Sequence, residues 1–183
     1  MASTRDRALD AALALVGEQG IRALTHARVD ERAGLPKGST SNWFRTRDAL
    51  VAGVAAWLAE SERNDFSAGA TTPSIDTPEE LVDALSLVIA VQSGPLASRT
   101  RARYALFLEG AGDEAMLAPL VAQRRVFVEW TTSLLRHVGA RSPEESARTL
   151  MAAGDGLLLH RLTVDPDAEI RPVVERAVRA CLD

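Results

Sequence analysis

The stretch LTHARVDERAGLPKGSTSNWFRTRDAL, residues 24–50, decides the fold predicted for this chain. Thr25 is a good N-cap, because its hydroxyl can accept a hydrogen bond from a free N–H group in the first turn of a helix. Gly34 ends that helix, since glycine adopts the left-handed C′ conformation at little cost. Pro36 suits the first position of a second helix, where a missing N–H costs nothing. Two short helices joined by a glycine turn predict a helix-turn-helix.

The second helix of this pair begins with small, polar or charged residues and ends with apolar bulk. Its polar members are Lys37, Ser39, Thr40, Ser41 and Asn42. Trp43 and Phe44 follow; we expect Phe44 in the core, while Trp43 is either a phosphate contact or half-buried core. Such a helix fits the major groove of DNA with its polar groups against base edges.

The rest of the chain predicts more helices and no strands. Aromatic residues make up only 4% of the sequence, alanine and leucine are frequent, and no alternating β pattern stands out. We therefore expect an all-α fold of about nine helices, with a three-helix helix-turn-helix domain over 1–46 and a larger helical domain over 47–183. The helices expected outside the helix-turn-helix are 4–18, 46–63, 77–94, 96–109, 114–138, 143–163 and 168–182, with a loop over 67–74.

The net charge of −4 would by itself argue against binding to nucleic acid, but the charges are unevenly distributed. Residues 1–50 hold eight basic and six acidic residues, a net charge of +2, whereas the remaining 13 basic and 19 acidic residues give −6. Lys37, the single lysine of the chain, stands at the start of the expected reading helix. The basic excess therefore coincides with the helix-turn-helix.

Several classes of protein and site are not expected. Cys181 is the single cysteine, which excludes an intramolecular disulfide and a cysteine-cluster metal site. His137 and His160 lack metal-site spacing to a second ligand on the same helix. Charged residues interrupt the N-terminal apolar residues, and no apolar run reaches membrane-spanning length. We expect a cytoplasmic protein with no membrane contact, no metal and no cofactor.

Residues 24–50 resemble the tetracycline-repressor (TetR) family of bacterial transcription regulators. The matching residues are Gly20, Leu24, Thr25, Val29, Ala33, Gly34, Leu35, Lys37, Gly38, Ser39, Phe44, Arg47 and Leu50. The chain departs from the family at Thr40 and Ser41, where leucine and tyrosine are usual, and at Arg47, where lysine is common. Because that tyrosine is a frequent phosphate contact, other groups must hold the DNA backbone here.

The residues expected to contact DNA lie around the two short helices. They are Thr25, His26, Arg28, Lys37, Gly38, Ser39, Thr40, Ser41, Asn42, Trp43 and Arg47. The candidates for base edges are Lys37, Gly38, Thr40 and Ser41, and those for phosphate are Asn42, Trp43 and Arg47. Phosphate contacts position the protein, whereas base contacts specify the sequence. Thr25 and His26 begin a helix whose free N–H groups can hold phosphate.

The resemblance also implies that 1–46 is a DNA-binding domain and 47–183 an effector-binding and dimerisation domain, with an effector pocket and a dimer face. The pocket candidates are Trp57, Ile89, Gln92, Arg103, Tyr104, Phe107, Trp130, Met151, Asp155 and His160. Asp155 is a pocket acid, a packing residue or an interface group. We expect homodimerisation through the eighth and ninth helices, whose apolar residues are Leu150, Leu157, Leu158, Leu159, Val173, Val174, Val178 and Leu182. A two-fold dimer would place its reading helices about one DNA turn, roughly 34–36 Å, apart on a palindromic operator.

The chain is therefore expected to be a homodimeric transcription repressor that binds double-stranded DNA sequence-specifically. A small-molecule effector would release it from its operator, and it is not expected to be an enzyme. A small α-helical enzyme and a helical protein-binding adaptor are the alternatives. Against the enzyme, no nucleophile–base arrangement stands out, and Gly154-Asp155-Gly156 lies in an expected helix rather than after a strand. Binding to a specific duplex distinguishes the repressor from both, and turnover of a small molecule would favour the enzyme.

Overall fold

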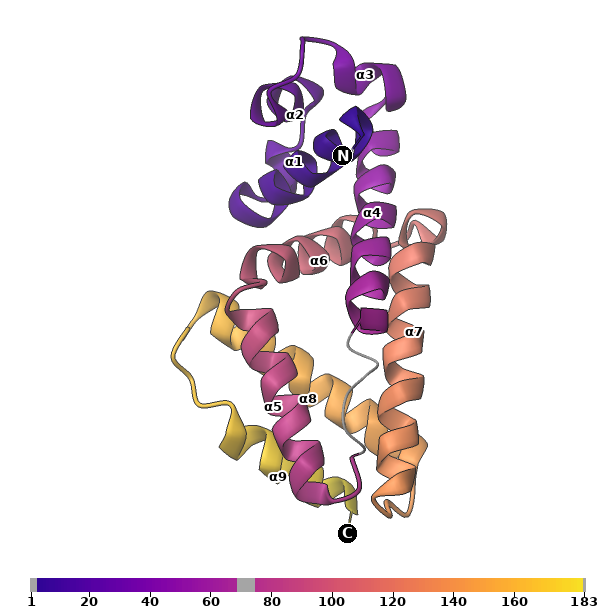
Figure 1. The fold of residues 1–183 in the computed structure, drawn as a ribbon, viewed down its shortest axis with the longest axis vertical. Helices are drawn as coiled ribbons and strands as arrows, with labels where there is room; N and C mark the ends of the chain where they lie inside the picture. Colours follow the sequence, from indigo (N-terminus) through magenta and orange to yellow (C-terminus); the bar gives the residue numbers. More distant parts are fainter. Residues whose placement is uncertain (1–2, 69–74, 183) are drawn as a thin grey trace. The chain divides into compact units, whose positions relative to one another are not determined.

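The structure is a computed structural model that describes residues 3–68 and 75–182, and all its regular elements in these ranges are helices (Figure 1). The predicted all-α class is confirmed. The elements are α1 (Thr4–Gln19), the 3-10 turn η1 (Ile21–Ala23), α2 (His26–Ala33), α3 (Ser39–Trp43), α4 (Arg47–Ala68), α5 (Pro78–Ser93), α6 (Ala97–Glu109), α7 (Glu114–His137), α8 (Pro143–Thr163) and α9 (Arg171–Leu182).

The chain forms two compact units. The first is built from Met1–Ala70 and Ser98–Gln123, and the second from Thr71–Ala97 and Arg124–Asp183. We call the α1–α3 part of the first unit the head. No single helix among the described residues is long and apolar enough to cross a membrane, and only α5 and α6 taken together pass by length and composition.

The helix ends follow the predicted signals closely. The Thr25 hydroxyl accepts a hydrogen bond from the Arg28 N–H at 3.4 Å, and Gly34 ends α2 with a left-handed φ of 63°. The Thr46 hydroxyl accepts from the Ala49 N–H at 3.1 Å before α4. Local side chains therefore fix most of these boundaries.

Three boundaries differ from the prediction. The short helix α3 begins at Ser39 rather than Pro36, because Gly38 adopts a left-handed φ of 87°. The helix α4 continues to Ala68, so 67 and 68 are helical, while the rest of the expected loop lies outside the described residues. The helix α9 begins at Arg171, and before it the Ala168 carbonyl accepts a hydrogen bond from Arg161.

The core of the first unit packs α1, α2 and α3 against α4 and α6. Its fully buried large side chains include Leu9, Val16, Leu24, Val29, Leu50, Val54, Leu58 and Leu106. Gly17 on α1 allows the closest approach, because a Cβ atom there would lie 2.1 Å from the Ser98 carbonyl oxygen. From α6, Arg103 pairs with Glu62 of α4 at 2.5 Å. The head therefore shares one core with α4 and α6.

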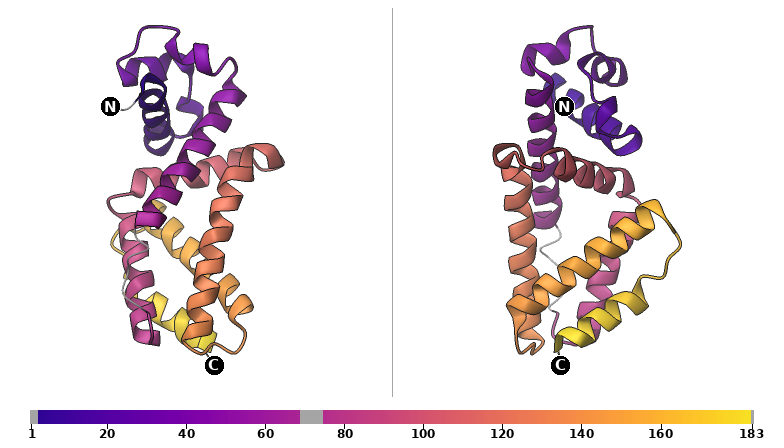
Figure 2. Two further views of the ribbon diagram at one scale, coloured as in Figure 1. Left: turned by 45° about the vertical axis from the view of Figure 1, so that its right-hand side comes forward. Right: turned by 180° about the vertical axis from the view of Figure 1, so that it is seen from behind.

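The second unit packs α5, α8 and α9 against one another (Figure 2). Val174, Val178 and Cys181 lie on the buried face of α9 at helical spacing. The Ser146 hydroxyl donates to the Cys181 carbonyl at 3.0 Å, which joins α8 to α9. Arg171 pairs with two acids at the start of α5, which joins α9 to α5.

Gly17→Ala should destabilise the protein, because the added methyl group meets backbone that cannot rotate away. We expect the free energy of unfolding to fall by about 1–3 kcal/mol, although alanine is the better helix former. Gly154→Ala is the matched control, since its Cβ would lie 3.7 Å from Ile89, an ordinary contact. Urea unfolding followed by circular dichroism measures both variants. Equal stability of Gly17→Ala and wild type would disprove the close α1–α6 contact.

Candidate nucleic-acid interface

The start of α2 is joined directly to the end of α3. His26 Nε2 lies 2.6 Å from the Phe44 carbonyl oxygen. Because a carbonyl oxygen can only accept, this ring nitrogen carries the hydrogen. The contact connects residues 18 positions apart. It therefore holds the start of α2 against the end of α3.

A buried carboxylate joins the same helices on the inner side. Asp30 of α2 is 3% exposed, and its two oxygens accept three hydrogen bonds. The donors are the Gly38 N–H at 2.7 Å, the Thr40 N–H at 2.8 Å and the Thr40 hydroxyl at 2.5 Å. Sequence analysis missed this group. The sequence feature that could have indicated it is the position of this acid directly after the core residue Val29, where the helical pattern places it beside the core.

The environment of Asp30 favours its charged form. Burial raises the pKa of this carboxyl, but the hydrogen bonds from Thr40 and Gly38 together outweigh burial, and the net pKa is lowered from its ordinary value. Electrostatic attraction to His26 lowers the pKa of Asp30 further. The carboxylate therefore remains ionised and can accept all three hydrogen bonds at neutral pH.

Phe44 anchors the end of α3 in the core, as predicted. Its side chain is 6% exposed. Gly53 of α4 leaves room for the ring, since a Cβ there would lie 2.4 Å from Phe44 Cε1. The Arg5 guanidinium lies 5.6 Å from the ring centroid, within cation–π distance. Trp43, by contrast, is 39% exposed and faces outward.

The outer side of α3 and its flanks offer charged and polar groups to a ligand. Lys37, Ser41 and Asn42 are exposed. Lys37 and Arg45 have no hydrogen-bond or ion-pair partner within residues 3–68 and 75–182. Arg45 was not predicted as a site residue. It stands between the buried Phe44 and the capping Thr46, so its side chain is directed outward.

Other predicted contacts already have partners inside the first unit. Thr40 is fully buried, so its side chain has no access to a duplex in this conformation. The Ser39 hydroxyl donates to the Pro36 carbonyl at 2.7 Å, and Arg28 donates to Gln19. Arg47 pairs with Glu109 at 2.9 Å. Thr25 caps α2, and the backbone of Gly38 is exposed.

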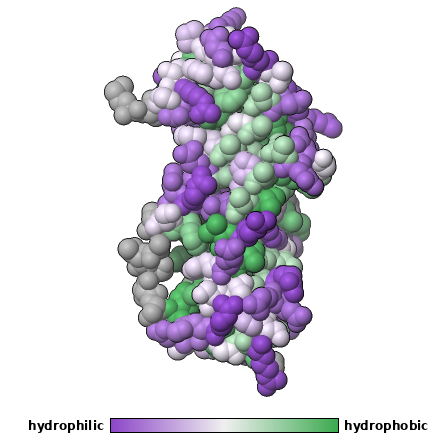
Figure 3. Space-filling model, turned by 90° about the vertical axis from the view of Figure 1, so that its right-hand side faces the viewer, coloured by the Kyte–Doolittle hydropathy of each residue, from purple (hydrophilic) through white to green (hydrophobic). Residues whose placement is uncertain are grey.

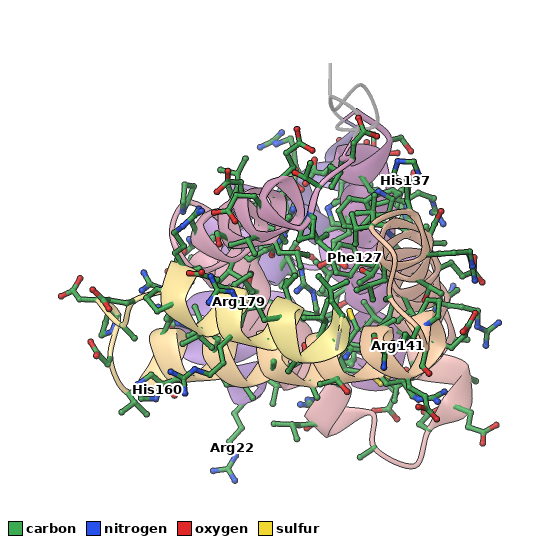
Figure 4. The ribbon with its side chains drawn as sticks, turned by 90° about the horizontal axis from the view of Figure 1, so that it is seen from below. Arg22, Phe127, His137, Arg141, His160 and Arg179 are labelled. Atoms are coloured by element: carbon green, nitrogen blue, oxygen red, sulfur yellow. The ribbon has the colours of Figure 1, made fainter. Side chains whose placement is uncertain are left out.

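The face of the head seen in Figure 3 carries many hydrophilic side chains. In this space-filling view, purple hydrophilic side chains lie among paler ones at the upper end, where the head lies. Arg22 of η1 extends from the ribbon into solvent (Figure 4). Like Lys37 and Arg45, it is an exposed cation that no described carboxylate neutralises. Such cations can neutralise phosphate.

The predicted effector residues are divided between the two units. Trp57, Arg103, Tyr104 and Phe107 lie in the first unit, and Ile89, Gln92, Trp130, Met151, Asp155 and His160 lie in the second. The Trp57 indole donates to Asp10 at 2.8 Å, which joins α4 to α1. Arg103 and Glu62 form a pair that is more than four-fifths buried, so both charges are already compensated.

Within the second unit, Asp155 of α8 pairs with Arg124 of α7, and both side chains are about one-third exposed. Trp130 contacts the Phe127 ring at a centroid distance of 5.3 Å. Ile89 is buried, whereas His160 lies at the surface near the end of α8 (Figure 4). These facts place an ion pair and an aromatic pair on helices α7 and α8.

The second unit also has a surface groove of about 420 Å³. It is lined by Val128, Glu129, Thr132, Arg136, Glu144 and Arg148. None of the predicted effector residues lines this groove. Among the described residues, no three His, Cys, Asp or Glu side chains gather as a metal site would require.

Comparison with known proteins identifies both parts of the chain. A family model described as bacterial regulatory proteins, tetR family, matches residues 8–54, and one described as tetracyclin repressor-like, C-terminal domain, matches 76–183. No curated protein sequence matches the chain.

Solved structures agree along the whole length. A TetR-family member from Streptomyces coelicolor A3 is 28% identical, with a TM-score of 0.75 over 98% of this chain and 99% of that chain. The multidrug binding protein EbrR, complexed with ethidium, is 27% identical, with a TM-score of 0.72 and the same coverage. A TetR-family transcriptional regulator from Streptomyces coelicolor shares the fold at 21% identity, with a TM-score of 0.77 over 98% and 94% of the two chains.

These matches do not favour the enzyme or adaptor alternatives. The family model of the C-terminal domain alone covers more than half of the chain. The family model that matches 8–54 covers the helix-turn-helix with its exposed cations. The chain therefore belongs to the tetR family of bacterial regulatory proteins and is a DNA-binding regulator of transcription.

Proposed function

We propose that this protein is a homodimeric repressor that binds a palindromic operator in the cytoplasm and leaves it when a small-molecule effector binds. The observation that carries the proposal is the outer side of α3, where Lys37 and Arg45 have no protein partner among the described residues. Cations kept free of carboxylates can exchange counterions for DNA phosphates.

We assign the DNA contacts by accessibility. The exposed residues Lys37, Gly38, Ser41, Asn42, Trp43 and Arg45 form the proposed reading surface. Thr25 and His26 offer the start of α2 to a phosphate. Arg28 and Arg47 would join only by exchanging their present partners, and Ser39 by turning its hydroxyl. Thr40 supports α3 from inside and is not kept as a contact.

The proposed division of labour keeps residues 1–46 as the DNA-reading part and 47–183 as the effector and dimer part. The two parts share one hydrophobic core, since residues of α4 and α6 pack against those of the head. An effector that prefers the DNA-released conformation would lower DNA affinity, and DNA would lower effector affinity by the same factor.

We place the dimer face on the outer sides of α8 and α9. Most of the predicted apolar residues there are buried within the protomer, including Leu157, Leu158 and Val178. Leu159 and Val173 are exposed by 42% and 43%. A Cβ added at the exposed Gly156 would meet no atom within 4 Å. A partner helix can therefore approach α8 closely at this point.

For the effector we propose a planar aromatic cation. EbrR is complexed with ethidium in one structure and with proflavin in another. In this chain Asp155 is a partly buried carboxylate that pairs with Arg124. A bound cation could take the place of Arg124 beside Asp155, and the aromatic side chains of α7 could stack on it.

Lys37→Ala and Arg45→Ala should each weaken DNA binding by about tenfold, because each removes a cation from the reading surface. Fluorescence anisotropy at several salt concentrations would also show a smaller salt dependence for a lost phosphate contact. Arg141→Ala is the matched control, since Arg141 is an exposed arginine of the second unit. Unchanged affinity of both head variants would remove these residues from the interface.

Wild-type protein should retard the DNA that flanks its own gene in a gel shift with unlabelled competitor. Absence of a retarded band on every flanking palindrome would contradict the repressor function.

Gly156→Arg should weaken the dimer, measured by size-exclusion chromatography with light scattering, and with it the affinity for the palindrome. Ala90→Arg on α5 is the control; a fully dimeric Gly156→Arg protein would exclude this face of α8.

Asp155→Asn should weaken ethidium binding by about tenfold, because it removes the negative charge beside the bound cation. The titration follows ethidium fluorescence without DNA, since ethidium intercalates into duplexes. Glu129→Gln makes the same charge change on the exposed side of α7 and should bind as wild type does. A wild type that binds neither ethidium nor proflavin would refute the cation class, and normal binding by Asp155→Asn would refute the role of Asp155.

A further inference from the structure

The helix α3 lacks the means to form by itself. It has five residues, and helices this short are unstable in isolation. Its N-cap residue is Gly38, which has no side chain to accept a hydrogen bond from the first free N–H groups. The order of α3 must therefore come from groups outside it.

Asp30 supplies the missing acceptor from the preceding helix. Its carboxylate binds the N–H groups of Gly38 and Thr40, which are eight and ten residues further along the chain. The Thr40 hydroxyl donates to the same oxygen as the Thr40 N–H, so both the backbone and the side chain of the first turn are held. Two glycines with left-handed φ, Gly34 and Gly38, lie in the connection that this contact closes.

The contact is not explained by stability alone. Asp30 is a buried charge, and the three groups that donate hydrogen bonds to it are uncharged. A buried charge costs desolvation free energy that a pair of apolar side chains of similar volume does not. The tetR family usually has leucine where Thr40 stands, so an apolar contact can fill this position in the same fold. What hydrogen bonds add is direction, because their strength falls steeply with angle.

We infer that Asp30 is a positioning residue for DNA reading, acting through Thr40 to fix the angle and register of α3. The inference rests on the proposed function, in which α3 meets base edges. Asp30 itself is buried and does not touch the duplex. Base contacts require placement within a fraction of an ångström, whereas cations on flexible side chains can follow phosphates over a wider range.

This role separates two quantities that a general loss of structure would lower together. Loosening α3 should reduce affinity for the operator, because base contacts depend on the angle of α3. Affinity for an unrelated duplex should remain, since Lys37 and Arg45 still neutralise phosphate. The ratio of the two affinities is therefore the diagnostic measurement.

The test uses the full chain and an operator selected by the wild type from random duplexes. Thr40→Val keeps the shape of the side chain and removes the hydroxyl, whereas Thr40→Ser keeps the hydroxyl and is the matched control. We expect Thr40→Val to lower the ratio of operator to scrambled-duplex affinity about tenfold, the effect of one lost hydrogen bond to a charge. Thr40→Ser should keep most of the wild-type ratio.

A second variant guards against misfolding. Asp30→Ala combined with Thr40→Leu replaces the polar contact by an apolar one and should remain folded by circular dichroism, yet discriminate poorly. A wild-type ratio in folded Thr40→Val and in the double variant would overturn the inference, and so would an equal fall of both affinities. A wild type that selects no sequence would instead refute the proposed function, and the inference with it.

Discussion

A buried carboxylate must be given donors, and that requirement organises the head. Asp30 is 3% exposed, and the first turn of α3 provides its three donors. The chain can bring that turn back to α2 only by reversing direction, and the left-handed glycines Gly34 and Gly38 make the reversal possible. The His26 contact to the Phe44 carbonyl closes the other end of the pair. The helix-turn-helix is thus held at two points by polar contacts, with the apolar core beneath it.

The next constraint is close packing between helices of the first unit. Gly17 on α1 and Gly53 on α4 leave space for Ser98 and for the Phe44 ring, so any larger residue would separate these elements. The ion pair between Arg103 of α6 and Glu62 of α4 is largely buried, and breaking either partner would leave an uncompensated charge. Support for the reading helix therefore extends into α4 and α6, which connects DNA reading with the part proposed to respond to effector.

Local signals were predicted well from the sequence, and tertiary choices were not. The Thr25 cap and Gly34 turn depend on neighbours within a few residues, and Phe44 follows an apolar pattern, so each was anticipated correctly. Thr40 looked like a surface residue, because a hydroxyl in a polar run is usually exposed. Its burial depends on Asp30, ten residues away, and no local rule pairs the two. The effector site was the least predictable, since its candidates belong to two separate units.

Charge in the head shows why net charge alone is a poor guide to DNA binding. Several of its arginines are committed to the protein: Arg7 donates to the Ala33 carbonyl at 2.7 Å, and Arg32 pairs with Glu18 at 2.6 Å. These cations stabilise α2 and do not remain available for phosphate. Lys37 and Arg45 flank α3 without such partners among the described residues. An acidic chain can therefore bind a polyanion, because uncommitted cations flank the reading helix and the acid beneath it, Asp30, already has its donors.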